Sequence, residues 1–451
     1  YVEPSHFDAA ICYVSATRYK SGDNKPYILK TSDYGKTWTM IANGMNENIY
    51  NRCVREDPTH KGMLYAGMET GIMISFNDGT SWQSLQLNLP NTPVHDIQVQ
   101  PREHDLVIAT HGRSFWILDD ITPLYQLNDA VAKSNAWLFA PRDTYRFPGF
   151  DYEESGENLY EGQNLSNGVM LRYYLKSKPA KEVRLIFYTA KDDSIITYSS
   201  AKDNKGKMVP VPKEFYQNPK VTPDGLLKTN AGINQFVWDM RYPSAKGDTS
   251  ATFEASLLGP KIVPGTYKVK MMMGDSLVNE QSFTIIRDPR NPATVADLQE
   301  QFDLNAKNCA KLNELSKATA LIKQITEQIN DYLPTITDSA KAKTLRTKGQ
   351  AIIDSLTAIR DALFNNKILA NEDNLRFPLR LEEKLATMNY QLQASDNKPT
   401  AGMYKVYNSL STQIDAQLAK LKNIVDTKVA EFNTLSSEIK KPVVDVSVKT
   451  E

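Results

Sequence analysis

Cysteine, histidine and long apolar runs are scarce in this sequence of 451 residues, and each scarcity excludes a class of protein. The three cysteines, Cys12, Cys53 and Cys309, are too few and too scattered for a disulfide framework or a zinc site. We expect buried free thiols, with a Cys12–Cys53 bridge as the alternative. The sequence contains only five histidines, and it has neither the spacing of metal ligands nor a phosphate-binding glycine loop. We therefore predict no bound metal and no cofactor. No apolar run reaches the roughly 18 residues that a membrane-spanning helix needs.

An excess of charge of one sign is also missing, because 53 basic and 53 acidic side chains cancel. This balance predicts no binding to nucleic acid or to an anionic membrane. A hydrophobic content of 41% is enough for ordinary folded cores. The length predicts about two to four domains, at roughly 100–200 residues each. The chain begins at Tyr1 without an initiator methionine or a signal peptide, which we interpret as a mature, processed or truncated chain.

The sequence does contain a repeat near its amino terminus. The segments PSH, PTH and PREH, which begin at Pro4, Pro58 and Pro101, each precede a pair of apolar runs. These runs alternate with a period of two and are separated by Gly, Asn and Pro, as expected for antiparallel strands. Four-stranded units that recur every 40–50 residues or so are typical of β-propeller blades.

Two of the three units continue into a shared turn, TSDYGKTW (31–38) and SFNDGTSW (75–82). The Asp or Asn can accept hydrogen bonds from its own loop, the Gly can adopt a positive φ, and the Trp can bury its ring between sheets. The pattern resembles the Asp box of bacterial neuraminidase-type repeats, which is found in sialidases, xyloglucan hydrolases and sortilin-type receptors and is structural there. The residues to which we assign these structural roles are Asp33, Gly35, Trp38, Asn77, Gly79 and Trp82.

Topology indicates where a ligand site would lie instead. If the Asp box joins strands three and four of a blade, the loop between strands two and three lies on the opposite face, together with the link to the next blade. Loops on a rigid scaffold carry function, so this face is the predicted site. Its candidate ligand-binding residues are Arg18, Tyr19, Glu69, His95, His111 and Arg113, and its candidate catalytic carboxylates are Glu69, Asp96 and Glu47. Arg113 could clamp an anion and His111 could relay a proton, or both could have packing roles.

Three units cannot close a ring, since propellers typically need about four to eight blades. We therefore expect the missing blades to come from N-terminal segments of the same protein, with a partner protein as the alternative. The predicted domains are propeller blades over 1–135, a connector over 136–164, a β-sandwich over 165–290, a four-helix bundle over 291–440 and a tail over 441–451. The fold class is multidomain, mainly β and then all-α.

The later domains follow from changes in apolar spacing. Alternating runs between residues 169 and 286 predict a β-sandwich with Trp238 in its core, and NQFVWDMRYP with GPKIVPGTYKVKM resembles an immunoglobulin-like domain of secreted bacterial enzymes. From residue 292 the spacing lengthens to three and four, and four apolar stripes predict an antiparallel helical bundle.

The order of these features resembles one group of proteins over nearly the whole chain. Asp-box blades, THGRSFWILDD, FVWDMRYP, VPGTYKV and a terminal helical bundle are similar to the C-terminal half of large secreted bacterial proteins of the sortilin-type or glycosyl-hydrolase-like repeat class. The resemblance implies two propellers ahead of the sandwich and a secreted, periplasmic or cell-surface location. Because shared repeats fix the fold and not the reaction, it implies no specific chemistry.

Three functions are compatible with these observations. The first is a binding or scaffold protein that recognises a glycan or a peptide on the propeller face. The second is a glycoside hydrolase with a carboxylate pair, for which Glu69 and Asp96 are the candidates. The third is a structural subunit of an envelope assembly that docks a partner protein through the helical bundle.

Overall fold

The computed structural model describes residues 1–146, 167–201, 226–247, 255–336, 340–365, 367, 373, 375–437, 444 and 445. It divides into two compact units, Tyr1–Ser134 and Asn135–Glu451, which are considered separately below. Most of the predicted connector (147–164) and most of the predicted tail lie outside the described residues. No helix in the described part of the chain is both long enough and apolar enough to cross a membrane.

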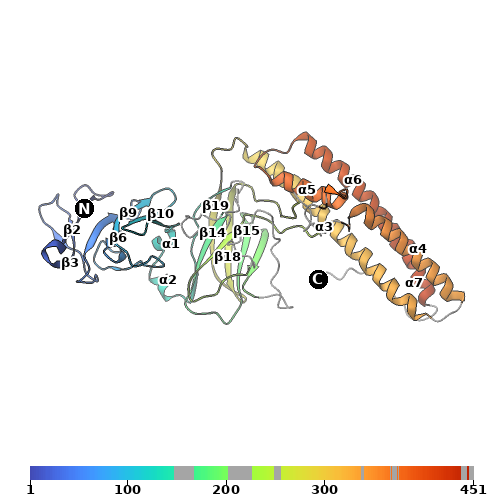
Figure 1. Cartoon of the computed structure of the whole chain (residues 1–451), viewed down its shortest axis with the longest axis horizontal. Coiled ribbons are helices and arrows are strands. Elements are labelled where there is room, and N and C mark those ends of the chain that lie inside the picture. Colours follow the sequence, from blue (N-terminus) through green and yellow to red (C-terminus); the bar gives the residue numbers. More distant parts are fainter. Residues whose placement is uncertain are drawn as a thin grey trace. The chain divides into compact units, whose positions relative to one another are not determined.

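The first unit consists of three antiparallel sheets that follow one another along the chain (Figure 1). The first sheet contains β1 (Val2–Pro4), β2 (Cys12–Arg18), β3 (Asp23–Thr31) and β4 (Thr39–Met40). The second contains β5 (Asn51–Glu56), β6 (Leu64–Met68), β7 (Gly71–Ser75) and β8 (Gln83–Ser84). The third contains only β9 (Val94–Gln100), β10 (Asp105–Thr110) and β11 (Phe115–Leu118), and is followed by α1 (Thr122–Tyr125) and α2 (Asp129–Lys133). The repeat therefore forms successive sheets, and the described residues do not show a closed propeller.

Alternating side chains join these sheets face to face. One face of the first sheet contributes Tyr13 and Ile28 to a core that includes Val54 and Leu64 of the second sheet. The opposite face of the second sheet, with Tyr65 among others, packs against the third sheet. Two cores on the two faces of one sheet are the expected result of period-two alternation. All three cysteines are free, as expected, so the alternative Cys12–Cys53 bridge is not formed; Cys53 and Cys309 are buried as predicted, whereas Cys12 is partly exposed.

The two repeated turns, residues 31–38 and 75–82, have the predicted internal hydrogen bonds. The amide of Thr37 donates to Asp33 at 2.9 Å, and the amide of Ser81 donates to Asn77 at the same distance. Gly35 and Gly79 have φ values of 84° and 79°, a region that favours glycine. These bonds close each loop on itself, so the turn contributes its polar groups to folding.

The two tryptophans of these turns differ, which corrects one expectation. Trp82 is buried as predicted, and its indole donates to the carbonyl of Ile41 in the first sheet at 2.6 Å. Trp38 is 43% exposed, and its indole donates to Gly35 in its own loop at 3.1 Å. The physical reason is that Trp82 packs on the preceding sheet, whereas no sheet among the described residues precedes Trp38.

The second unit begins with two sheets around one core. The three-stranded sheet has the order β12 (Ala136–Leu138), β14 (Val169–Leu175), β17 (Gly232–Trp238). The five-stranded sheet has the order β13 (Thr144–Arg146), β19 (Ser276–Arg287), β18 (Gly265–Met273), β15 (Val183–Thr189), β16 (Ser194–Ser199). Trp238 is fully buried in the shared core, as predicted. Two strands, β12 and β13, lie within the range predicted as a connector.

The remainder of the second unit is helical, in agreement with the predicted change of period. Its helices are α3 (Val295–Tyr332), α4 (Ala340–Leu363), α5 (Leu381–Gln393), α6 (Ala401–Ile424) and α7 (Ala430–Ser437). The long helices α3, α4 and α6 run side by side in Figure 1 and bury their apolar stripes in a common core. A capping box at Thr294 and Asp297 starts α3.

A buried polar junction connects the sandwich to the helices. The guanidinium of Arg146, at the end of β13, lies 2.9 Å from the carboxylate of Asp396 and also donates to Gln301 and to the carbonyl of Ile262. Arg146 is only 2% exposed. A buried arginine needs such a complete set of acceptors, so this junction fixes the sandwich against α3 and the end of α5.

Candidate functional site

The loops of the first unit bring six side chains together at one end of the three sheets. Tyr19, Glu69 and His111 come from the connections between second and third strands, as the topology predicts, and Tyr50 comes from a link between sheets, whereas Arg52 lies in β5 and His95 in β9. We call this group the loop-face cluster; its members are Tyr19, Tyr50, Arg52, Glu69, His95 and His111. Four of them, Tyr19, Glu69, His95 and His111, are residues that the sequence predicts.

Arg52 organises one half of the loop-face cluster. The rings of Tyr19 and Tyr50 stack with centroids 4.7 Å apart, and the Arg52 guanidinium lies 5.4 Å and 4.8 Å from their respective centroids. The same guanidinium contacts the carboxylate of Glu69 at 2.6 Å and donates to the Tyr50 hydroxyl at 3.0 Å. Cation–π and charge-assisted contacts of this kind hold a polar aromatic surface in one conformation.

Two exposed histidines form the other half. The imidazoles of His95 and His111 stack with centroids 5.0 Å apart and an interplanar angle of 14°. Partial burial lowers the pKa of His95, and the positive charges of Arg52 and His111 lower it further, while Glu69 acts in the opposite direction. The His95 imidazole therefore takes up a proton at a lower pH than an ordinary histidine does.

Backbone hydrogen bonds between loops and links fix the base of the loop-face cluster. The amide of Glu69 donates to the carbonyl of Tyr50 at 3.0 Å, and the amide of His111 donates to the carbonyl of Pro93 at 2.9 Å. Each bond ties a loop to the link that enters a strand of the second or third sheet. The side chains above them are thus presented from anchored backbone, which favours a preformed site.

The other predicted binding residues lie beside this cluster. Arg18 lies 3.5 Å from the carboxylate of Asp23 and 6.0 Å from the ring of Tyr27. Arg113 is exposed, and its guanidinium donates at 3.3 Å to the carbonyl of Gly112 in the same tight loop as His111. Arg113 is therefore available to a ligand, whereas Arg18 is partly committed to its own hairpin.

The two candidate catalytic carboxylates occupy different ion pairs. Glu69 pairs with Arg52, whereas Asp96 lies 3.0 Å from Arg55 and accepts from the amide of Ile97 at 2.8 Å. A hydrolase pair needs one acid and one base free to face the same bond. Because each carboxylate is held by its own arginine, this placement gives the hydrolase hypothesis no support. The third candidate, Glu47, is exposed in the link between the first two sheets.

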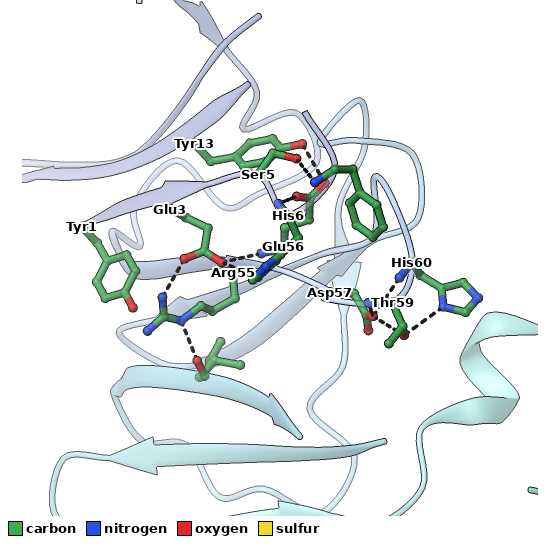
Figure 2. A network of polar contacts seen from close by, with 12 residues as sticks. Tyr1, Glu3, Ser5, His6, Tyr13, Arg55, Glu56, Asp57, Thr59 and His60 are labelled. Atoms are coloured by element: carbon green, nitrogen blue, oxygen red, sulfur yellow. Dashed lines mark hydrogen bonds and ion pairs between the residues drawn. The ribbon is translucent and has the colours of Figure 1, made fainter. Parts of the chain in front are cut away.

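Arg55 belongs to a second, more buried network, which Figure 2 shows. Its guanidinium lies 2.6 Å from Glu3, and the amide of His6 donates to Glu56 at 3.0 Å. Burial raises the pKa of Glu3. Each of these carboxylates accepts hydrogen bonds from backbone or side chains of neighbouring strands, so this network joins the first sheet to the second and third.

Sequence reasoning missed Tyr50 and Arg52, which lie in the link and in β5 and not in a hairpin loop. One available signal was their spacing of two residues, which places both side chains on the same face of the chain. Their stacking with Tyr19 depends on the packing of the first two sheets, which no local pattern encodes.

Comparisons with known proteins add little to this description. No protein-family model matches the chain, and no curated protein matches it. Among solved structures, the crystal structure of an ancestral GH74 enzyme is similar to it at 14% sequence identity, with a TM-score of 0.21. The match covers 65% of this chain and 39% of that structure, so the chain corresponds to well under half of its length.

Proposed function

We propose that the first unit is a glycan-binding module and that the loop-face cluster is its binding site. The observation that carries this proposal is the stacked Tyr19–Tyr50 pair, held by Arg52 next to the polar groups of Glu69 and His95. Rigid aromatic rings bind the apolar C–H face of a pyranose, and adjacent carboxylate and imidazole groups exchange hydrogen bonds with its hydroxyls. A peptide is the other ligand class compatible with such a surface.

Glycan binding is tested with a glycan array and two matched tyrosine variants. Tyr19→Ala removes a ring from the cluster, whereas Tyr34→Ala removes a ring that is 76% exposed in the Asp-box turn of the same sheet. We expect at least a tenfold loss of affinity for Tyr19→Ala, which corresponds to about 1.4 kcal/mol, and no change for Tyr34→Ala. Binding of peptides in place of glycans, or equal binding by both variants, would overturn the proposal.

A partner surface is also proposed, on the outer face of the first sheet. Cross-strand pairing aligns Val2, Val14, Leu29 and Met40 on this face, one residue from each strand. Val2 is 63% exposed and Met40 is 49% exposed. An apolar row across a whole sheet is the kind of surface that other β-sheets cover.

The internal interface indicates what covers this row. Trp82 of the second sheet donates to the carbonyl of Ile41, which directly follows the fourth strand of the first sheet. By repetition, we propose that Trp38 packs on a further four-stranded sheet, and that N-terminal propeller segments of the same protein supply it. A second copy of this chain is poorly suited to cover the apolar row with its third sheet, because that sheet has no fourth strand among the described residues. Oxidative footprinting of Met40 in the protein from its natural source, compared with the 451-residue chain, tests this: unchanged oxidation would contradict it.

The remaining sequence predictions fit this proposal. A glycan-binding module of this kind suits a secreted, periplasmic or cell-surface protein, and the helical region would dock an envelope protein partner. The groove between α5 and α6, with a volume of about 500 Å³, is the surface on which to test that docking; it is lined by residues that include Leu379, Met388, Met403, Val406 and Leu410.

A further inference from the structure

We propose that the glycan bound by the loop-face cluster carries an oxyanion, a carboxylate or a sulfate, and that it binds together with protons on His95 and His111. This inference rests on the proposed function, since it assigns the chemical class of the ligand at the same site.

The first step is the distribution of charge on this face. Arg52 is neutralised by Glu69 at 2.6 Å, and Arg18 lies 3.5 Å from Asp23. Arg113 and Lys20 of this face have no carboxylate partner among the described residues, and the two imidazoles add positive charge once they are protonated. This face therefore carries cationic side chains without a carboxylate partner next to its aromatic rings, and such side chains can bind an anionic sugar.

The second step is the geometry of the histidine pair. The two rings are exposed and lie 5.0 Å apart, and their nitrogens have no hydrogen-bond partner among the residues that the structure describes. Two imidazoles without partners at this separation can each donate to a different oxygen of one oxyanion. In the free protein a proton on His95 is opposed, because Arg52 and His111 both face this ring. An arriving anion removes this opposition.

The third step is the direction of the pH dependence. His95 is faced by Arg52 and His111, which disfavour its charge, and by Glu69, which favours it; Arg113 lies in the loop of His111. The pKa of His95 is lowered in the free protein, and a bound oxyanion would raise it. Binding then takes up protons, so affinity for an acidic glycan increases as the pH falls through the ordinary histidine value of about 6.5. Binding of a neutral glycan takes up no protons.

The experiment is isothermal titration calorimetry of the whole chain with three tetrasaccharides at pH 5.5, 6.5 and 7.5, in buffers of different ionisation enthalpy. The probes are tetragalacturonate, a sulfated galactose tetramer and neutral galactotetraose. We expect at least tenfold tighter binding of one acidic probe at about pH 5.5 than at about pH 7.5, with proton uptake. The two acidic probes distinguish carboxylate from sulfate recognition.

Two variants assign the effect to the histidines. The double variant His95→Gln/His111→Gln retains polarity but does not titrate, and it should bind the acidic probe with no pH dependence. His6→Gln, which changes a histidine outside the cluster, should behave as the unchanged protein. Equal binding of neutral and acidic probes at every pH would overturn this inference and leave glycan binding intact. Failure to bind any glycan on the array would instead overturn the proposed function.

Discussion

Trp38 and Trp82, at equivalent positions of the two repeated turns, allow the packing of the sheets to be tested within one chain. Trp82→Ala and Trp38→Ala delete the same side chain from the same motif, but Trp82 is 6% exposed and Trp38 is 43% exposed. Removing a fully buried tryptophan costs roughly 3–5 kcal/mol. The bond from Trp82 to the Ile41 carbonyl contributes about 1 kcal/mol of that, because its loss leaves a carbonyl without its partner.

The Trp38→Ala substitution should reduce the free energy of unfolding much less, for a structural reason. Nearly half of its surface already contacts water, and its indole bond is made within its own loop, to Gly35. We expect about 1–2 kcal/mol for Trp38→Ala, and therefore a difference of about 2 kcal/mol or more between the two variants. Tyr34→Ala, at 76% exposure, is the control and should change stability by less than about 0.5 kcal/mol.

Hydrogen exchange measured by mass spectrometry is the appropriate assay. The chain contains two compact units, so a single melting transition would not report on one interface. Peptides from β6 and β7, which adjoin Trp82, should lose protection in Trp82→Ala and keep most of it in Trp38→Ala. Equal losses in the two variants, or a larger loss in Trp38→Ala, would refute the conclusion that the first sheet has an uncovered face.

Three further substitutions test other parts of the fold. Asp396→Asn leaves Arg146 buried without its carboxylate and should cost roughly 3–5 kcal/mol in the second unit, measured by differential scanning calorimetry; a cost below about 1 kcal/mol would contradict the junction described above. Gly79→Ala should be more destabilising than Gly35→Ala by about 1–3 kcal/mol, because both glycines have positive φ but only Gly79 would place a Cβ 2.5 Å from Ile41. Hydrogen exchange of β7 and β3 peptides compares the destabilisation caused by the two glycine substitutions. Equal destabilisation would show that backbone strain from the positive φ, and not the contact with Ile41, determines the effect.

Much of the fold was predictable because its signals are local. The period-two runs that lead into the two repeated turns form strands as expected, and the change of spacing near residue 292 marks the start of α3. The short strands β12 and β13 were not predictable in this way. β13 pairs in parallel with β19, so its conformation depends on a partner about 140 residues away and not on its own three residues.

The candidate site likewise has features that the sequence predicts and features that depend on tertiary packing. Chain topology was enough to predict that Tyr19, Glu69, His95 and His111 lie on one face, because strand order alone determines which loops share an end. It could not indicate the role of Arg52, which depends on a stacking contact between a loop of the first sheet and the link to the second. It also gave Trp38 and Trp82 the same role, because both residues end the same kind of turn, whereas the sheet that adjoins each turn differs.

The location of the loop-face cluster couples its proposed function to the packing of the sheets. Tyr19 belongs to the first sheet and stacks on Tyr50, which enters the second, while His95 and His111 belong to the third. Each half of the cluster therefore lies across or beside a seam between sheets. A contact such as Trp82 on Ile41, at the other end of the first seam, fixes the distance between Tyr19 and Arg52 without touching a ligand. Under the proposed function, the repeat motif would thus contribute to recognition through geometry, because it sets the separation of the loops that carry the cluster.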